Sequence, residues 1–185
     1  MVDTSAAGRL LVSVPDLGDD NFDRTVVFVV DHDDGGALGL VLNRPGEARV
    51  LDHLPDLGIP VIEPAVFFAG GPVAPGAVLV LGRRAPEDGL RNAVSVSGPV
   101  VVVDVERLVE ADVDGVDGLR LFSGYSGWGP GQLDGELEAR VWHVADASPD
   151  DVLCARPEDL WRSVLRRQGG RTGTLGLFPD DPNLN

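Results

Sequence analysis

The chain has 185 residues, a length that favours a single domain, and its 15 basic residues are all arginine. Against 30 acidic residues they leave a formal net charge of −15, which repels the phosphates of nucleic acids and anionic membranes. The absence of lysine excludes a Schiff-base lysine and a P-loop lysine, and the single cysteine, Cys154, excludes an intramolecular disulfide and a multi-cysteine zinc site.

Hydrophobic patterning predicts mainly strands in the first two thirds of the chain. The run 25–30 is β-branched and aromatic throughout, which predicts a strand covered on both faces, and the turn 33–36 joins it to 37–42 as a β-hairpin. A short amphipathic helix is predicted over 50–57, and Asp104 is a candidate N-cap for a helix that carries Val105, Leu108 and Val109 on one face. Further strands are predicted over 9–14, 66–68, 77–81, 93–96, 100–103 and 119–122, with an exposed polar loop over 83–91.

The last third of the chain predicts helices around one short strand, 141–144. Pro130 fits the first turn of a helix, and Ser148 with Pro149 is typical of an N-cap followed by the first helical residue, with Cys154 expected to be buried nearby. The clearest helix runs from Pro157 to the glycines at 169–170, with arginines 166–167 as favourable last-turn charge. Residues 1–8 and 172–185 are expected to be less ordered tails of one domain spanning 1–185.

Acidic residues and one histidine lie close together in Asp31-His32-Asp33-Asp34, an arrangement that invites a metal hypothesis. An EF-hand loop needs glutamate at its twelfth position, where this sequence has Leu42. A solvated hairpin turn is the favoured interpretation, and we predict no metal and no cofactor.

The glycine-rich segment 124–131 follows a predicted strand and precedes a predicted helix. It resembles the nucleophile elbow G-x-S-x-G, but Trp128 replaces the last glycine, and its spacing does not match the dinucleotide fingerprint either. A structural turn is therefore favoured over catalysis at Ser126 or a nucleotide site. Trp128 lies among four glycines, so its ring must find a groove or a ligand elsewhere in the molecule.

Three stretches together resemble the AlgH/YqgE family of bacterial proteins. They are 22–45, with Phe-Asp-Arg-Thr-Val-Val and Asp-His-Asp-Asp-Gly-Gly-Ala-Leu-Gly-Leu-Val-Leu-Asn-Arg-Pro; 70–73, with Gly-Gly-Pro-Val; and 124–136, with Gly-Tyr-Ser-Gly-Trp, Gly-Gln-Leu and Glu136. The ending, 160–182, is similar to the actinobacterial branch. The resemblance implies an α+β fold in which a mixed, strongly bent sheet forms a pseudo-barrel with helices packed on it. The family carries a label of transcriptional regulator, from alginate control in one bacterial group, and it implies no catalytic residues.

We hypothesise a non-enzymatic cytoplasmic module that binds a small molecule or a protein and influences transcription indirectly, without direct nucleic-acid or membrane contact. Residues 1–8 lack the basic start and apolar core of a signal peptide, so we expect none, and no apolar stretch reaches about 18 residues. One alternative is an enzyme acting on a small polar substrate through His32, Arg44 and Glu136, and another is a structural subunit of an assembly. Convergence of these polar groups in one cleft would favour the enzyme.

The candidate binding surface lies where the predicted loop 124–132 meets 43–45 and 70–72, because loops held by a rigid sheet often carry binding groups. Its side chains include an arginine, two aromatics and two amides, which together could hold a polar ligand or a partner segment. Asn43 and Gln132 could instead only tie loop backbones together. The full set of candidates is His32, Asn43, Arg44, Gly70, Gly71, Tyr125, Trp128, Gln132 and Glu136.

Overall fold

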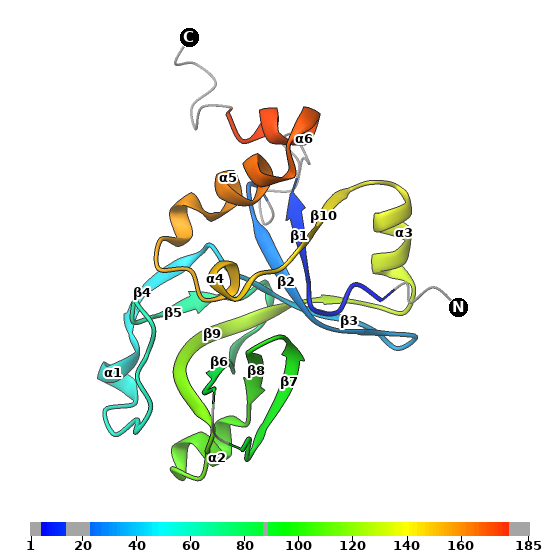
Figure 1. Cartoon of the computed structure of the whole chain (residues 1–185). Coiled ribbons are helices and arrows are strands. Elements are labelled where there is room, and N and C mark those ends of the chain that lie inside the picture. The colour runs from blue at the N-terminus through cyan, green and yellow to red at the C-terminus, as the bar shows by residue number, and fades with distance from the viewer. Residues whose placement is uncertain (1–4, 14–22, 87–88, 178–185) are drawn as a thin grey trace.

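The computed structural model of the protein describes residues 5–13, 23–86 and 89–177. The strands are β1 (Arg9–Ser13), β2 (Val26–Asp33), β3 (Gly36–Val41), β4 (Pro45–Arg49), β5 (Val66–Ala69), β6 (Val73–Arg84), β7 (Ala93–Ser97), β8 (Val100–Val103), β9 (Val116–Trp128) and β10 (Trp142–Asp146). The helices are α1 (Val50–His53), α2 (Val105–Val109), α3 (Gln132–Glu138), α4 (Pro149–Val152), α5 (Pro157–Gln168) and α6 (Gly170–Leu175). Figure 1 shows the long strand β9 passing through the middle of the molecule, between the elements near the termini and the β6–β8 region.

The strands form one strongly bent sheet. Its main path runs β10-β1-β2-β3-β9-β6-β8-β7, while β5 pairs with β9 in parallel and with β4 in antiparallel orientation. Gly8, just before β1, lies against Ser97 at the end of β7, so the sheet curls into a half-barrel (Figure 1). The predicted α+β fold, a bent mixed sheet with helices packed on it, is confirmed.

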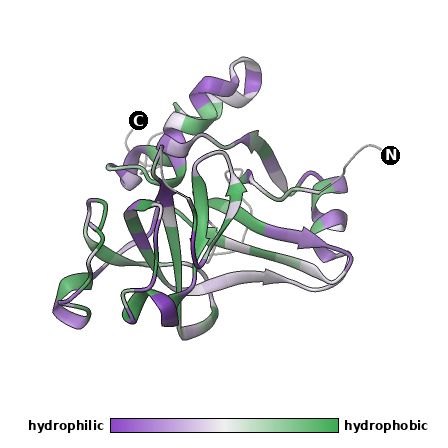
Figure 2. Cartoon of the chain, turned by 60° about the horizontal axis from the view of Figure 1, so that its bottom comes forward, coloured by the Kyte–Doolittle hydropathy of each residue, from purple (hydrophilic) through white to green (hydrophobic). Residues whose placement is uncertain are grey.

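Strand β2 is buried on both of its faces, as its continuous apolar run predicts. Val26 and Phe28 join the core cluster that includes Trp161 of α5, whereas Val27 and Val29 join the cluster around Trp128 beneath α3. Side chains alternate between the two faces of a strand, so β2 lies between these two clusters. Figure 2 shows hydrophobic residues concentrated on the central strands and hydrophilic ones at helices and hairpin ends.

Helix-capping residues behave as their sequence patterns predict. Asp104 accepts a hydrogen bond from the Arg107 N–H at the start of α2, and Ser148 forms a reciprocal capping box with Asp151 at α4. Helix α5 begins at Pro157 and ends before Gly169, with its buried residues on one face. At twelve residues, α5 is the longest helix, and no helix in the described ranges is long and apolar enough to cross a membrane.

Several boundaries differ from the predictions. The expected loop at 124–132 is a strand as far as Trp128, because β9 continues to find partners: Tyr125 lies opposite Val73 of β6, and Trp128 lies opposite Ala37 of β3. Glycines in this stretch allow close backbone approach within a strand rather than marking a turn. Pro130 precedes α3 instead of lying in its first turn, and Cys154 is half-buried rather than buried.

Two elements had no sequence prediction. Strand β4 is exposed along its whole length, so it has no apolar alternation, and α6 contains two glycines and two threonines. Gly176 packs against Leu165 and Arg166, which holds the end of α6 on α5. Val14 of the first predicted strand, part of the predicted loop 83–91 and part of both expected tails lie outside the described residues.

Candidate functional site

The three segments of the predicted binding surface do come together in space. Gly70 bridges a fork in the sheet: its carbonyl accepts from the Val41 N–H and its N–H donates to the Ser123 carbonyl, both at 2.9 Å. A Cβ on Gly70 would lie 2.2 Å from the Gly124 oxygen, and one on Gly71 would lie 2.3 Å from the Tyr125 carbonyl carbon. Both glycines are therefore required by close backbone approach.

Asn43 and Arg44 contact the start of β2. The Asn43 side chain accepts from the Val26 N–H at 2.9 Å and donates to the Arg24 carbonyl at 2.8 Å, so it ties two strand ends together. Arg44 donates to the Asp23 carbonyl at 3.0 Å, and its own carbonyl accepts from the Ala69 N–H. The side-chain oxygen and nitrogen of Asn43 are thus both hydrogen-bonded to backbone groups.

Glu136 is the acceptor at the centre of a tryptophan cluster. Its Oε2 accepts from the indole N–H of Trp128 at 2.9 Å and of Trp142 at 2.7 Å, and its Oε1 accepts from Gln132 at 3.0 Å. The two indoles meet edge to face with centroids 6.3 Å apart. Gln132 also accepts from the Gly129 N–H. Trp128 therefore finds its groove against α3 and Trp142, and these side chains hold α3 on the sheet.

His32 joins the N-terminal segment and α3 to the end of β2. Its Nδ1 accepts from the Ala6 N–H at 3.0 Å, which leaves Nε2 as the protonated nitrogen, and Nε2 lies 3.6 Å from Asp134. Arg44 contacts Asp23 near the other end of β2. Of the three residues in the enzyme alternative, His32 and Glu136 thus contact α3 or hold it on the sheet. Arg44 lies away from both of them.

The remaining sequence motifs have structural roles. Asp33 accepts from the Gly35 N–H in the hairpin turn, and the described part of the chain contains no group of three potential metal ligands among its histidine, cysteine and acidic residues. Ser126 is buried within β9, with its hydroxyl 3.4 Å from the Gly70 carbonyl. An exposed nucleophile elbow is absent at this serine, because Ser126 lies inside a paired strand.

Arg120 is a buried cation that sequence patterns did not reveal. It lies in β9 at 1% exposure, stacks 4.5 Å over Phe68, and donates to the carbonyls of Glu63 at 2.9 Å and Val152 at 3.4 Å. Its Nε has no hydrogen-bond partner. Burial lowers the pKa of the guanidinium to about 10, an effect opposed by the nearby Cys154. The side chain is enclosed by protein, so we assign it to the core.

The most concentrated positive charge lies on α5 together with the flanking residues Arg156 and Arg171. Five of the chain's 15 arginines fall within residues 156–171, where Glu158 and Asp159 are the only acidic residues, so this segment has a formal charge of +3. An open groove of about 780 Å³ runs along the helix. Its lining consists of Arg156, Asp159, Arg162, Ser163, Arg166 and Arg167.

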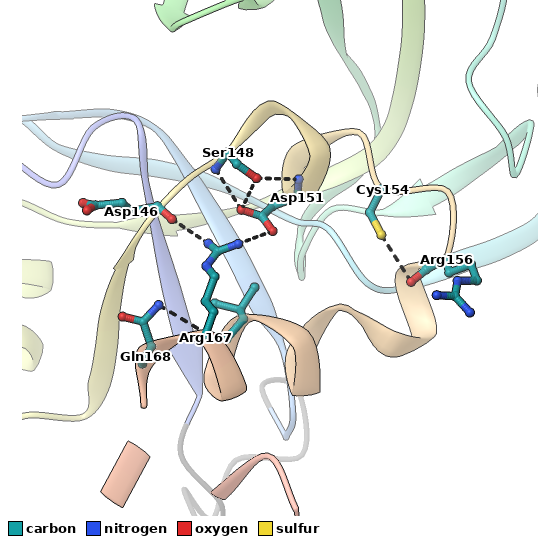
Figure 3. Close-up of polar contacts among 8 residues, drawn as sticks. Asp146, Ser148, Asp151, Cys154, Arg156, Arg167 and Gln168 are labelled. Carbon is teal, nitrogen blue, oxygen red and sulfur yellow. Dashed lines mark hydrogen bonds and ion pairs between the residues drawn. The ribbon is translucent and has the colours of Figure 1, made fainter. Parts of the chain in front are cut away.

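One wall of this groove is fixed by a charged network (Figure 3). Arg167 donates to the Asp151 carboxylate at 2.6 Å and to the Asp146 carbonyl at 2.7 Å. Asp151 is nearly buried and also accepts from the Ser148 hydroxyl and N–H. Burial alone would raise the pKa of Asp151, but the hydrogen bonds from Arg167 and Ser148 outweigh burial and hold it below its ordinary value.

Arg156 and Arg166 are less constrained than Arg167. Arg156 is largely exposed and makes one ion pair, 3.4 Å from Asp159, of the surface type that contributes little free energy. Arg166 is exposed, with no ion pair to any residue in the described ranges. The sequence signal for this site is the local excess of arginine, of which the pair 166–167 also fits favourable charge in the last turn of a helix.

Comparison with known proteins identifies the family. The AlgH-like family profile matches residues 10–173. The chain belongs to the AlgH-like family. A UPF0301 protein of Streptomyces coelicolor is 46% identical over 98% of this chain and 96% of its own length, and one of Mycobacterium leprae is 43% identical over 97% and 90%.

Solved structures share the AlgH-like fold. A crystal structure from Corynebacterium diphtheriae matches with a TM-score of 0.86 and 29% identity, covering 95% of this chain and 94% of that one. The solution structure of AlgH from Pseudomonas aeruginosa matches with a TM-score of 0.69 and 25% identity, covering 98% of both chains. These names carry no activity, so function rests on the site itself.

Proposed function

We propose that this AlgH-like protein is a non-enzymatic cytoplasmic module that binds an anionic group, on a small molecule or a partner protein, in the arginine groove of α5. Any influence on transcription is then indirect, without nucleic-acid contact. The observation that carries the proposal is the local charge of +3 over residues 156–171 in a chain of −15. Such a concentration of one sign in a groove attracts ligands of the opposite sign.

The arrangement of polar residues elsewhere supports binding over catalysis. An active site brings a base or nucleophile together with groups that orient it around one reacting atom. Here Glu136 is occupied by two indoles and Gln132, and His32 is occupied by the Ala6 N–H, which accounts for both as structural residues. In contrast, the Arg166 side chain packs against Gly176 through its aliphatic part, while its guanidinium makes no ion pair or hydrogen bond in the described ranges, as a ligand-binding group requires.

The predicted surface around Gly70 remains a second candidate for partner binding. The Tyr125 ring lies beside the Gly127 backbone and the side chain of Val73, which is 37% exposed. Arg44 is half-buried on the neighbouring segment. An aromatic residue and an arginine next to apolar surface are typical of protein interfaces, although the amides expected to contribute are committed elsewhere.

The proposal is tested by isolating the protein from its host and identifying co-purifying proteins and small molecules by mass spectrometry. Arg166→Glu should lose an anionic species that the unaltered chain retains, and Arg84→Glu, a matched change at an exposed arginine of β6, should retain it. If the Arg166→Glu variant retains the anionic species, the groove is not its binding site. Loss only in Arg44→Ala would move the binding site to the surface around Gly70.

A further inference from the structure

The spacing of the arginines on α5 defines the kind of anion that the groove can hold. Arg162 and Arg166 are one helical turn apart, about 6 Å along the axis, with Ser163 between them, and the row from Arg156 to Arg166 spans about 15 Å. Guanidinium groups bind phosphate oxygens in a bidentate manner, and a serine hydroxyl supplies a further donor. The row therefore places arginines on successive turns along one side of the helix.

Acidic residues limit how far an anion can extend. Asp159 lies within the groove, and Asp150 and Glu158 are exposed nearby, whereas the exposed carboxylate of Asp146 beyond the Arg167 end is paired with Arg9 at 2.8 Å. A long polyanion would leave the arginine row and meet this negative surface, which repels it. A short anion with a high charge density gains the attraction of the arginines without that repulsion.

Arg167 and Arg166 should contribute differently to ligand binding. Arg167 is neutralised by Asp151 at 2.6 Å, so it shapes the wall rather than supplying net charge. Arg166 keeps its charge and is exposed beside it. A ligand therefore depends on Arg166 more than on Arg167, although both line the groove.

We propose that the groove binds the phosphate chain of a small di- or triphosphorylated molecule. This proposal rests on the proposed function and specifies the ligand class of the same site. Two or three linked phosphates carry enough charge to contact arginines on successive turns, and they are short enough to stay clear of the flanking carboxylates. A single phosphate would contact fewer arginines and bind more weakly.

The test is isothermal titration of the full chain, at about 0.05 and 0.15 M salt, with orthophosphate, pyrophosphate and tripolyphosphate as probes. Affinity should rise in that order and fall with salt. Arg166→Gln should weaken tripolyphosphate binding about tenfold, the loss expected for a charge-assisted contact. Arg84→Gln removes the same charge outside the groove and should change the affinity less than twofold. Thermal melting of each variant establishes that it is folded.

A hexaglutamate peptide separates this proposal from the proposed function. If the peptide binds in an Arg166-dependent manner and the polyphosphates do not, the phosphate class is wrong and the anion groove stands. If neither probe binds, both proposals are overturned. Equal loss of polyphosphate binding in Arg166→Gln and Arg84→Gln would show nonspecific charge attraction and would also overturn the phosphate site.

Discussion

Removing the carboxylate of Glu136 should destabilise the fold strongly, because it is the common acceptor for two indole N–H groups and the Gln132 amide. A hydrogen bond to a charged group contributes about 1.5–3 kcal/mol, and a donor left unsatisfied in a buried place costs about 1–3 kcal/mol. Trp128 and Trp142 are 7% and 5% exposed, so water replaces the lost acceptor poorly. We expect Glu136→Ala to lower the free energy of unfolding by about 4 kcal/mol.

The conservative substitution Glu136→Gln should destabilise the fold less than Glu136→Ala does. Glu136→Gln keeps one oxygen that can face both indoles, while its amide nitrogen meets the Gln132 amide, which can reverse only by giving up the bond that it accepts from the Gly129 N–H. We expect a loss of about 1–2 kcal/mol, equivalent to about one weakened bond. Glu138→Ala, an exposed change on the same helix, serves as the control and should stay within about 0.5 kcal/mol of the unaltered chain.

Urea unfolding followed by tryptophan fluorescence and circular dichroism measures these differences. The midpoint should shift while the slope stays constant, since the buried surface is nearly unchanged. A loss below about 1 kcal/mol in Glu136→Ala, or an equal loss in the Glu138→Ala control, would refute the structural assignment of Glu136. Its candidacy as a catalytic group would then be open again.

Four further predictions concern charge and metals. The folded state lowers the pKa of Asp151, so the stability that its ionised carboxylate contributes is present above about pH 4 and is lost as the pH falls further. Asp151→Asn should therefore lower the free energy of unfolding by about 2 kcal/mol at pH 7, measured by urea unfolding. The difference between the two proteins should shrink below about pH 4. The lowered pKa of Arg120 indicates a buried charge that opposes folding at neutral pH. Arg120→Met, which fills the same space without the charge, should therefore change the free energy of unfolding by less than about 1 kcal/mol. Arg120→Ala should lower it by about 3 kcal/mol, because it leaves a cavity. Anisotropy titration with promoter DNA at about 0.15 M salt should detect no sub-micromolar complex that survives competitor, and such a complex would contradict the charge argument. Elemental analysis should find no stoichiometric zinc, and EDTA should leave the melting temperature unchanged, whereas a fall of several degrees would reveal a structural metal.

The sequence predicted those parts of the fold that local chemistry determines. The capping box at Ser148, the N-cap at Asp104 and the proline-to-glycine limits of α5 depend on neighbouring residues, so each could be inferred from a short window. The continuous apolar run of β2 likewise indicated burial on both faces, because such a run leaves no polar face for solvent.

Features that depend on distant partners were harder to predict. Glycine spacing indicated a loop at 124–132, but pairing with Val73 and Ala37 extends β9 through it. The binding candidates were chosen because no packing role was evident, and the structure supplies that role for Asn43, Gln132 and Glu136 through contacts with other segments. The groove arginines come from one helix, so their excess could have been counted directly.

The most direct test of anion recognition on α5 is an NMR titration of the isotope-labelled chain with pyrophosphate, followed through its backbone amide signals. We predict saturable shifts confined to residues 156–167 and to the contacting segment 146–151, with loss of those shifts in Arg166→Gln. Shifts centred instead on Arg44 and Tyr125, or no saturable shift at any position, would contradict the assignment of the arginine groove as the binding site.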